Sequence, residues 1–108
     1  MAIPVRITFR DIDPSDAIGA RINDRVRRLQ RFAKRATGLH VTVAAPHHSG
    51  QKGKLYQFTL ELLMPGRDIV VKQGDTPNHA HEDVYVAMRD AFTALERRVH
   101  DHMDKRGP

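Results

Sequence analysis

A row of arginines in the first third of the chain has the spacing and chemistry needed to bind phosphates. Arg21, Arg25, Arg28 and Arg35 lie four, three and seven residues apart. On an α-helix these spacings bring side chains to one flank. A guanidinium group can hold a phosphate with two parallel hydrogen bonds. Each arginine alone would be an ordinary solvated side chain, but the aligned row predicts a surface for a phosphate backbone.

The net charge of the chain is confined to the segment that holds this row. The 108 residues include 18 Lys or Arg and 13 Asp or Glu, a formal net charge of +5. Residues 16–35 contain seven basic and two acidic side chains, so this segment accounts for all of it. Such a concentration favours a polyanionic partner. Nucleic acid is favoured over a membrane because no strongly apolar face accompanies the charge.

Composition excludes several classes of protein. Without cysteine, the chain has no disulfide framework, thiolate nucleophile or Cys-ligated zinc. The first residues lack the apolar stretch of a signal peptide, and no apolar run approaches the ~20 residues that span a bilayer. We therefore expect a cytoplasmic protein without a membrane partner. Residues 1–108 are expected to form a single domain around one modest core.

Hydrophobic periodicity predicts the elements that position the arginines. Apolar residues alternate in four stretches, which predicts strands at residues 3–9, 39–45, 56–64 and 69–72. Pro4 suits an edge strand, and Pro65-Gly66 predicts a hairpin turn. Ser15 is the expected N-cap of the first helix and Gly38 its C-cap. A last helix is expected from about Glu82 to Lys105, which gives the order β-α-β-β-β-α.

The apolar stripes of the helices predict how these elements pack. We expect one set of buried side chains from the two helices: Ile22, Val26, Leu29, Val84, Met88, Phe92 and Leu95. The strands each have one apolar face, so both helices should cover the same face of a four-stranded sheet. The opposite face of the sheet would be polar and solvated. The predicted fold is a two-layer α+β fold, similar in layout to double-stranded-RNA-binding domains.

The last helix offers a second set of cations. Arg98 and Lys105, seven residues apart, share a flank of this helix with the small residues Ala87 and Ala94. If that flank faces the arginine row, two lines of cations border a shallow channel between the helices. We therefore expect RNA to bind in this channel.

Several short motifs resemble a known family. They are the run His81-Glu82-Asp83-Val84-Tyr85-Val86-Ala87-Met88, then Leu95-Glu96-Arg97, and on the first helix Asp24-Arg25-Val26 with Leu29. With the element order and length, they make the chain resemble the short ribosome hibernation promoting factors and ribosome-associated translation inhibitors (HPF/YfiA/RaiA). The resemblance covers essentially the whole chain. Its most specific part is the His-Glu-Asp-x-Tyr-x-Ala run at the start of the last helix.

The resemblance implies a partner and a role. Members of that family fold as β-α-β-β-β-α and bind the small (30S) subunit of the 70S ribosome, where messenger and transfer RNA would lie. They hold ribosomes inactive under stress or in stationary phase. The implied contact is with 16S rRNA, made by a protein expected to be monomeric when free. The resemblance implies that positions that are basic in the family are occupied here by Arg25, Arg28, Arg31, Arg97 and Lys105.

The chain also departs from the family pattern. Ala94 and Asp101 stand where close members often carry Lys. The last helix is therefore expected to contribute less to RNA binding, and the first helix more. Glu82 and Asp83 favour the start of a helix through its dipole, so the motif can be a fold determinant. Tyr85 can be packed or can contact RNA, and it is kept as a binding candidate.

Two other functional classes stay open. One is a general double-stranded-RNA-binding module, and the less favoured one is a metal-binding stress protein suggested by the seven histidines. His100 and His102 point about 200° apart on a helix, so they cannot hold one ion together. No phosphate loop, nucleophile elbow or paired carboxylates are visible. We therefore predict neither an enzyme nor a cofactor, metal or small-molecule substrate.

Overall fold

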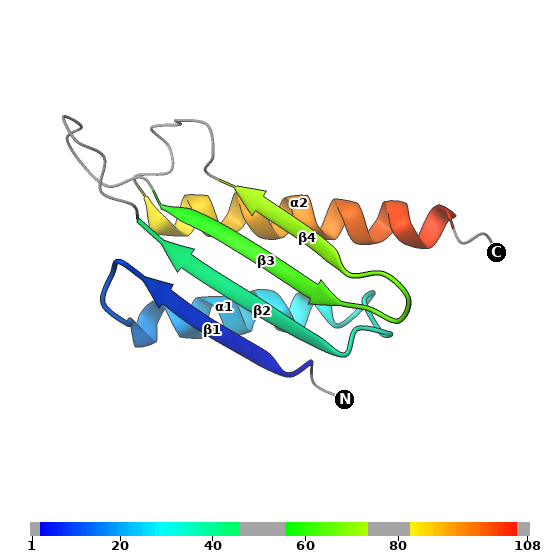
Figure 1. Cartoon of the computed structure of the whole chain (residues 1–108), viewed down its shortest axis with the longest axis horizontal. Coiled ribbons are helices and arrows are strands. Elements are labelled where there is room, and N and C mark those ends of the chain that lie inside the picture. Colours follow the sequence, from blue (N-terminus) through cyan, green and yellow to red (C-terminus); the bar gives the residue numbers. More distant parts are fainter. Residues whose placement is uncertain (1–2, 46–55, 74–82, 106–108) are drawn as a thin grey trace.

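The predicted order of elements is confirmed by the structure, a computed structural model that describes residues 3–45, 56–73 and 83–105 (Figure 1). Strand and helix bounds, in chain order, are β1 Val5–Arg10, α1 Asp16–Leu29, β2 Gly38–Ala44, β3 Gln57–Leu63, β4 Ile69–Gln73 and α2 Val84–Lys105. The loops expected at residues 46–54 and 74–80 lie entirely outside the described residues.

The four strands form one mixed sheet in the order β1-β2-β3-β4. β1 runs parallel to β2, while β2–β3 and β3–β4 are antiparallel. Pro4 precedes an edge strand, as expected, and its carbonyl oxygen accepts a hydrogen bond of 2.9 Å from the amide of Leu39. α1 and α2 lie on the same face of the sheet and run in the same direction (Figure 1). The α+β prediction, with both helices on one face, is therefore confirmed.

A single core lies between the sheet and the helices. Its largest fully buried side chains come from every element except β1 and β4: Phe58, Phe92, Ile22, Leu29, Leu60, Leu62, Leu95, Val41, Val43 and Val99. The expected helix stripes are confirmed, with one difference. Val84 is only partly buried, because it is the first residue of α2 and packs at the margin of the core.

The opposite face of the sheet is polar, as predicted. Register places Thr8, Thr42 and Thr59 side by side across β1, β2 and β3. The hydroxyl of Thr8 lies 2.9 Å from Nε2 of His40, so these two side chains share a hydrogen bond. Three exposed cations also belong to this face: Arg6, Arg10 and Lys72. These three cations lie on the face opposite the helices, so they can serve as a control for three arginines of the first helix.

The start of α1 is as expected, but its end is not. Ser15 is the N-cap, and its side chain accepts a hydrogen bond of 3.2 Å from the amide of Ile18. The helix ends at Leu29, with Gln30 as its C-cap. After the helix, residues 30–32 form a tighter turn, in which the amide of Phe32 donates a hydrogen bond of 3.2 Å to the carbonyl of Leu29. Apolar spacing continues past the helix because this tighter turn still faces the core.

Gly38 is the first residue of β2, so its prediction as the C-cap of α1 was wrong. The glycine is explained by close packing against β3. A Cβ atom at residue 38 would lie 3.3 Å from Cδ1 of Leu63, a tight contact. The preceding amide, that of Thr37, already donates to the carbonyl of Leu63 at 2.8 Å. This hydrogen bond therefore holds the residue before β2 against the end of β3.

The hairpin between β3 and β4 is confirmed. Gly66 has a φ of 86°, a conformation that glycine adopts without a steric penalty. The side chain of Asp68 accepts a hydrogen bond of 3.1 Å from the amide of Met64, which closes the turn. Among the described residues, no helix combines the length and apolar character needed to cross a membrane.

Candidate nucleic-acid interface

Three arginines of the predicted row line a shallow groove between the two helices. Arg21, Arg25 and Arg28 project from one flank of α1, and Tyr85 and Met88 line the groove from α2. The groove has a volume of about 330 Å³ and is open to solvent. Arg21 and Arg28 are exposed, whereas Arg25 is half-buried. The aliphatic stem of Arg25 can thus pack near the apolar stripe while its guanidinium stays at the surface.

Over residues 84–102, where side chains are described, the flank of α2 that faces these arginines carries no row of cations. Cζ of Arg21 lies 5.0 Å from the ring centroid of Tyr85, a cation–π contact. Nε of Arg28 lies 3.4 Å from Oε2 of Glu96, an ion pair between the helices. The helices thus meet through an arginine on α1 and an aromatic or acidic partner on α2.

A third contact lies beyond the end of α1. The rings of Phe32 and His100 are stacked, with centroids 4.6 Å apart and an angle of 22° between their planes. Phe32 follows Arg28 by four residues, and His100 follows Glu96 by four. Because the helices run in the same direction, the ring stack continues the line of the ion pair. His100 therefore has a packing role.

Arg98 does not face the arginine row, so the expected channel bordered by two lines of cations was wrong. Its Nη1 donates a hydrogen bond of 3.3 Å to the carbonyl of Val70 on the edge strand β4. Arg98 follows Glu96 by two residues, which places it about 200° around the helix. Arg97 is exposed to solvent. Lys105 is the last residue of α2, and its side chain lies outside the described residues.

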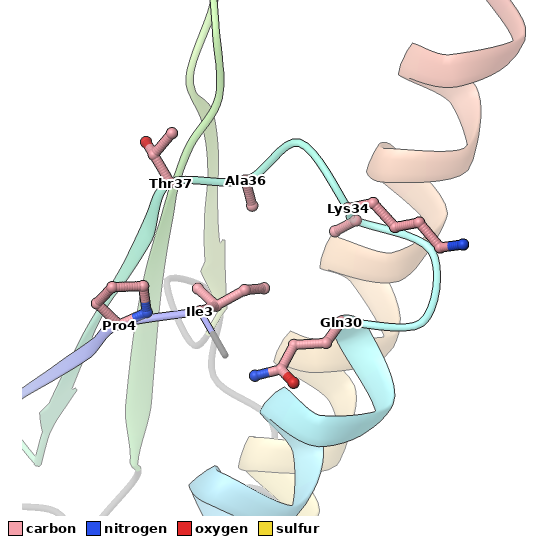
Figure 2. A pocket seen from close by; sticks show the side chains of 7 residues that line it. Ile3, Pro4, Gln30, Lys34, Ala36 and Thr37 are labelled. Carbon is pink, nitrogen blue, oxygen red and sulfur yellow. The ribbon is translucent and has the colours of Figure 1, made fainter. Parts of the chain in front are cut away.

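Arg31 and Arg35 follow the end of α1 and are therefore not part of its helical row. Both are exposed, in the segment that joins α1 to β2. Lys34 in the same segment lines a second hollow of about 600 Å³, beside Ile3 and Pro4 (Figure 2). Figure 2 shows the Lys34 ammonium group pointing away from Ile3 and Pro4. These cations can extend the basic surface of α1, but they do not line the groove.

Two acidic groups at the groove were not identified as site residues from the sequence. Asp24 lines the groove and pairs with the exposed side chain of Arg27. Glu96 is more enclosed, with a side chain only 13% exposed. The sequence could have indicated that Glu96 lies on the same flank of α2 as Tyr85. Glu96 follows Tyr85 by eleven residues, which is close to three helical turns. The two residues therefore share a flank.

The histidines give no sign of a metal centre in the part of the chain that the structure describes. No three His, Asp or Glu side chains come close enough there to hold an ion together. His47, His48, His79 and His81 lie outside the described residues, as does Glu82 of the motif at the start of α2. Asp83 is described, and its carboxylate accepts a hydrogen bond of 2.9 Å from the amide of Tyr85. This bond supports the helix-start role considered for the motif.

The sequence of this chain matches the model of the Sigma 54 modulation protein / S30EA ribosomal protein family over residues 5–107. The chain belongs to this family. The match covers every strand and helix of the structure, including both sides of the groove. The expected kinship with ribosome hibernation factors is thereby confirmed. No curated protein matches the chain at a significant level.

Solved structures agree with the fold of this S30EA family member. A ribosomal subunit interface protein from Coxiella burnetii is 14% identical with a TM-score of 0.77, covering 94% of this chain and 99% of its own. The Protein Y N-terminal domain from Thermus thermophilus is 24% identical with a TM-score of 0.61, covering 92% and 96%. At these identities the likeness shows the fold alone.

Family membership decides the broad class of function. The protein is a ribosome-associated factor of a non-enzymatic family, so the prediction that it is not an enzyme is confirmed. The family does not by itself say which of the nine predicted binding residues touch RNA: Arg21, Arg25, Arg28, Arg31, Arg35, Arg97, Arg98, Lys105 and Tyr85. The RNA-binding roles of these nine residues stay predictions. The stronger candidates are the four that line the groove: Arg21, Arg25, Arg28 and Tyr85.

Proposed function

We propose that this S30EA family member is a translation inhibitor that binds the small ribosomal subunit through the groove between α1 and α2. The observation that carries the proposal is the row of Arg21, Arg25 and Arg28 along that groove. Arg28 follows Arg21 by seven positions, about 10 Å along a helix axis, so the row can contact more than one phosphate of an RNA backbone. The surface fits rRNA better than an apolar protein partner.

The proposed location on the subunit is the channel that messenger and transfer RNA occupy, where 16S rRNA surrounds the bound protein. Occupancy there would prevent translation by steric exclusion and needs no chemical step. The proposed setting is the cytoplasm under stress or in stationary phase, when idle ribosomes accumulate. The free protein is proposed to act as a monomer, one copy per subunit.

Binding of this kind should depend on one face of the protein. We expect the triple variant Arg21→Glu, Arg25→Glu, Arg28→Glu to lose most of its affinity for purified 30S subunits. The matched control is Arg6→Glu, Arg10→Glu, Lys72→Glu, which makes the same change in charge on the opposite face of the sheet. The control should bind nearly as well as the parent. Both variants must first show the thermal stability of the parent, because Arg25 is half-buried.

Three measurements complete the test. Chemical footprinting of 16S rRNA should show protection in the channel for messenger and transfer RNA, and bound tRNA should compete. Cell-free translation should stop at about one copy of protein per ribosome, with no cleavage of RNA. An equal loss in both triple variants would show that diffuse net charge drives binding, and the groove model would be wrong. Binding that instead follows the amount of any duplex RNA would favour the general double-stranded-RNA-binding module.

A further inference from the structure

Glu96 is an acid within a surface that is proposed to bind phosphates. It projects from α2 toward α1, and its side chain is only 13% exposed. Its Oε2 lies 3.4 Å from Nε of Arg28, and this oxygen makes no hydrogen bond to any described residue. By charge alone, an acid at this position repels RNA. Its place beside the groove therefore needs a different explanation.

The geometry of the ion pair supplies one. The contact is made through Nε of Arg28, on the side of the guanidinium nearest its stem. Among the described residues, no ion pair or hydrogen bond engages the two terminal amino groups, and the Arg28 side chain as a whole is 65% exposed. Those two amino groups form an edge that can hold a phosphate with parallel hydrogen bonds. An arginine fixed on its inner side thus keeps its binding edge free.

We propose that Glu96 is a positioning residue that holds the Arg28 guanidinium between the helices with its outer edge directed at an RNA phosphate. This inference rests on the proposed function of the groove. Arginine loses much rotamer freedom when it is immobilised in an interface. A side chain already restrained in the free protein has less freedom to lose when RNA binds. Glu96 would therefore raise the affinity for rRNA despite its negative charge.

The proposal and simple electrostatics predict opposite signs for one substitution. Glu96→Gln removes a negative charge at nearly constant size, so charge alone would make RNA binding tighter. Loss of positioning should instead weaken binding to purified 30S subunits by about threefold to tenfold, the range expected for ordering one long side chain. The matched control is Asp90→Asn, which removes an acid from the same helix that pairs with Arg89 and does not line the groove. The control should bind at least as tightly as the parent.

A double-mutant cycle separates positioning from general structural damage. In an Arg28→Ala background there is no guanidinium to position, so adding Glu96→Gln should leave affinity unchanged or increase it. A second readout needs no ribosome, because loss of the ion pair should increase the fast motion of the Arg28 Nε–H group measured by NMR relaxation in Glu96→Gln. Equal or tighter binding of Glu96→Gln in the parent background overturns the inference. So does an equal loss of affinity in both backgrounds.

The outcomes also distinguish this inference from the proposed function. If Arg28→Ala weakens binding but Glu96→Gln does not, the groove binds RNA and only the role of Glu96 is wrong. If the groove triple variant binds 30S subunits as tightly as the parent, the proposed function itself fails and the positioning role fails with it.

Discussion

The guanidinium of Arg21 lies over the ring of Tyr85, with Cζ 5.0 Å from the ring centroid. The contact joins α1 to α2 at one end of the groove, and the Arg28–Glu96 ion pair joins them further along. The basic surface is thus supplied by α1, while α2 supplies partners that fix its side chains. Such a division of roles explains how the arginines of α1 are presented in an ordered way at the groove.

The first prediction concerns Tyr85. Tyr85→Ala should weaken binding to purified 30S subunits by about twofold to fivefold, because Arg21 loses an exposed cation–π contact of about 0.5–1 kcal/mol. Tyr85→Phe keeps the ring and should bind like the parent. Affinities from filter binding or sedimentation will check both values. A loss in Tyr85→Phe equal to that in Tyr85→Ala would mean that the hydroxyl contacts RNA directly.

The second prediction concerns salt. If Arg28 neutralises a phosphate, Arg28→Ala should make the plot of log affinity against log salt concentration less steep by about 0.9, the slope per contact for B-DNA, or about 0.7 for a single strand. Arg10→Ala, on the opposite face of the sheet, should leave the slope unchanged. The measurement is a salt titration of binding to 30S subunits. An unchanged slope for Arg28→Ala would remove it from the interface.

The third prediction concerns the helix that carries the site. Ser15→Ala removes the acceptor for the amide of Ile18, which should lower the free energy of unfolding by about 1 kcal/mol. Ser15→Asp keeps an acceptor and should stay close to the parent. Urea unfolding monitored by circular dichroism measures both. A Ser15→Asp variant as unstable as Ser15→Ala would argue against capping as the cause.

The fourth prediction concerns the core beneath the groove. Ile22 is 0% exposed and lies beside Arg21 and Arg25, so Ile22→Ala should cost about 2–5 kcal/mol of folding stability. Val70 is 46% exposed on the other face of the sheet, and Val70→Ala should change stability by no more than about 0.5 kcal/mol. Chemical denaturation of the two variants tests the contrast. Similar losses would place the core elsewhere than between the sheet and the helices.

Much of the fold was predictable because local chemistry and global packing agree. Ser15 caps α1 through its own hydroxyl, and Gly66 permits the hairpin through its own backbone. The alternation of Leu39, Val41 and Val43 places one face of β2 in the core whatever covers it. Arg21, Arg25 and Arg28 form a row for an equally local reason, since they lie within one helix. Patterns like these need only the period of the element that holds them.

The errors arose where the answer depends on another element. The role of Gly38 is set by close packing against Leu63, which lies 25 residues beyond Gly38 in the chain. The apolar stripe of α2 shows which side of the helix is buried, but it does not show which of the two neighbouring flanks faces α1. The strand order β1-β2-β3-β4 decides this. That order turns Glu96 toward Arg28 and leaves Arg98 beside Val70 on the edge strand.

The sequence by itself therefore determined the two-layer α+β fold, the ribosome as the class of partner and the row of arginines along one helix. Only the tertiary structure decided which residues surround the arginines of that helix. The physical reason is that charge and periodicity are properties of a segment, whereas a contact such as Arg28–Glu96 requires two helices to be docked on the same sheet in one order.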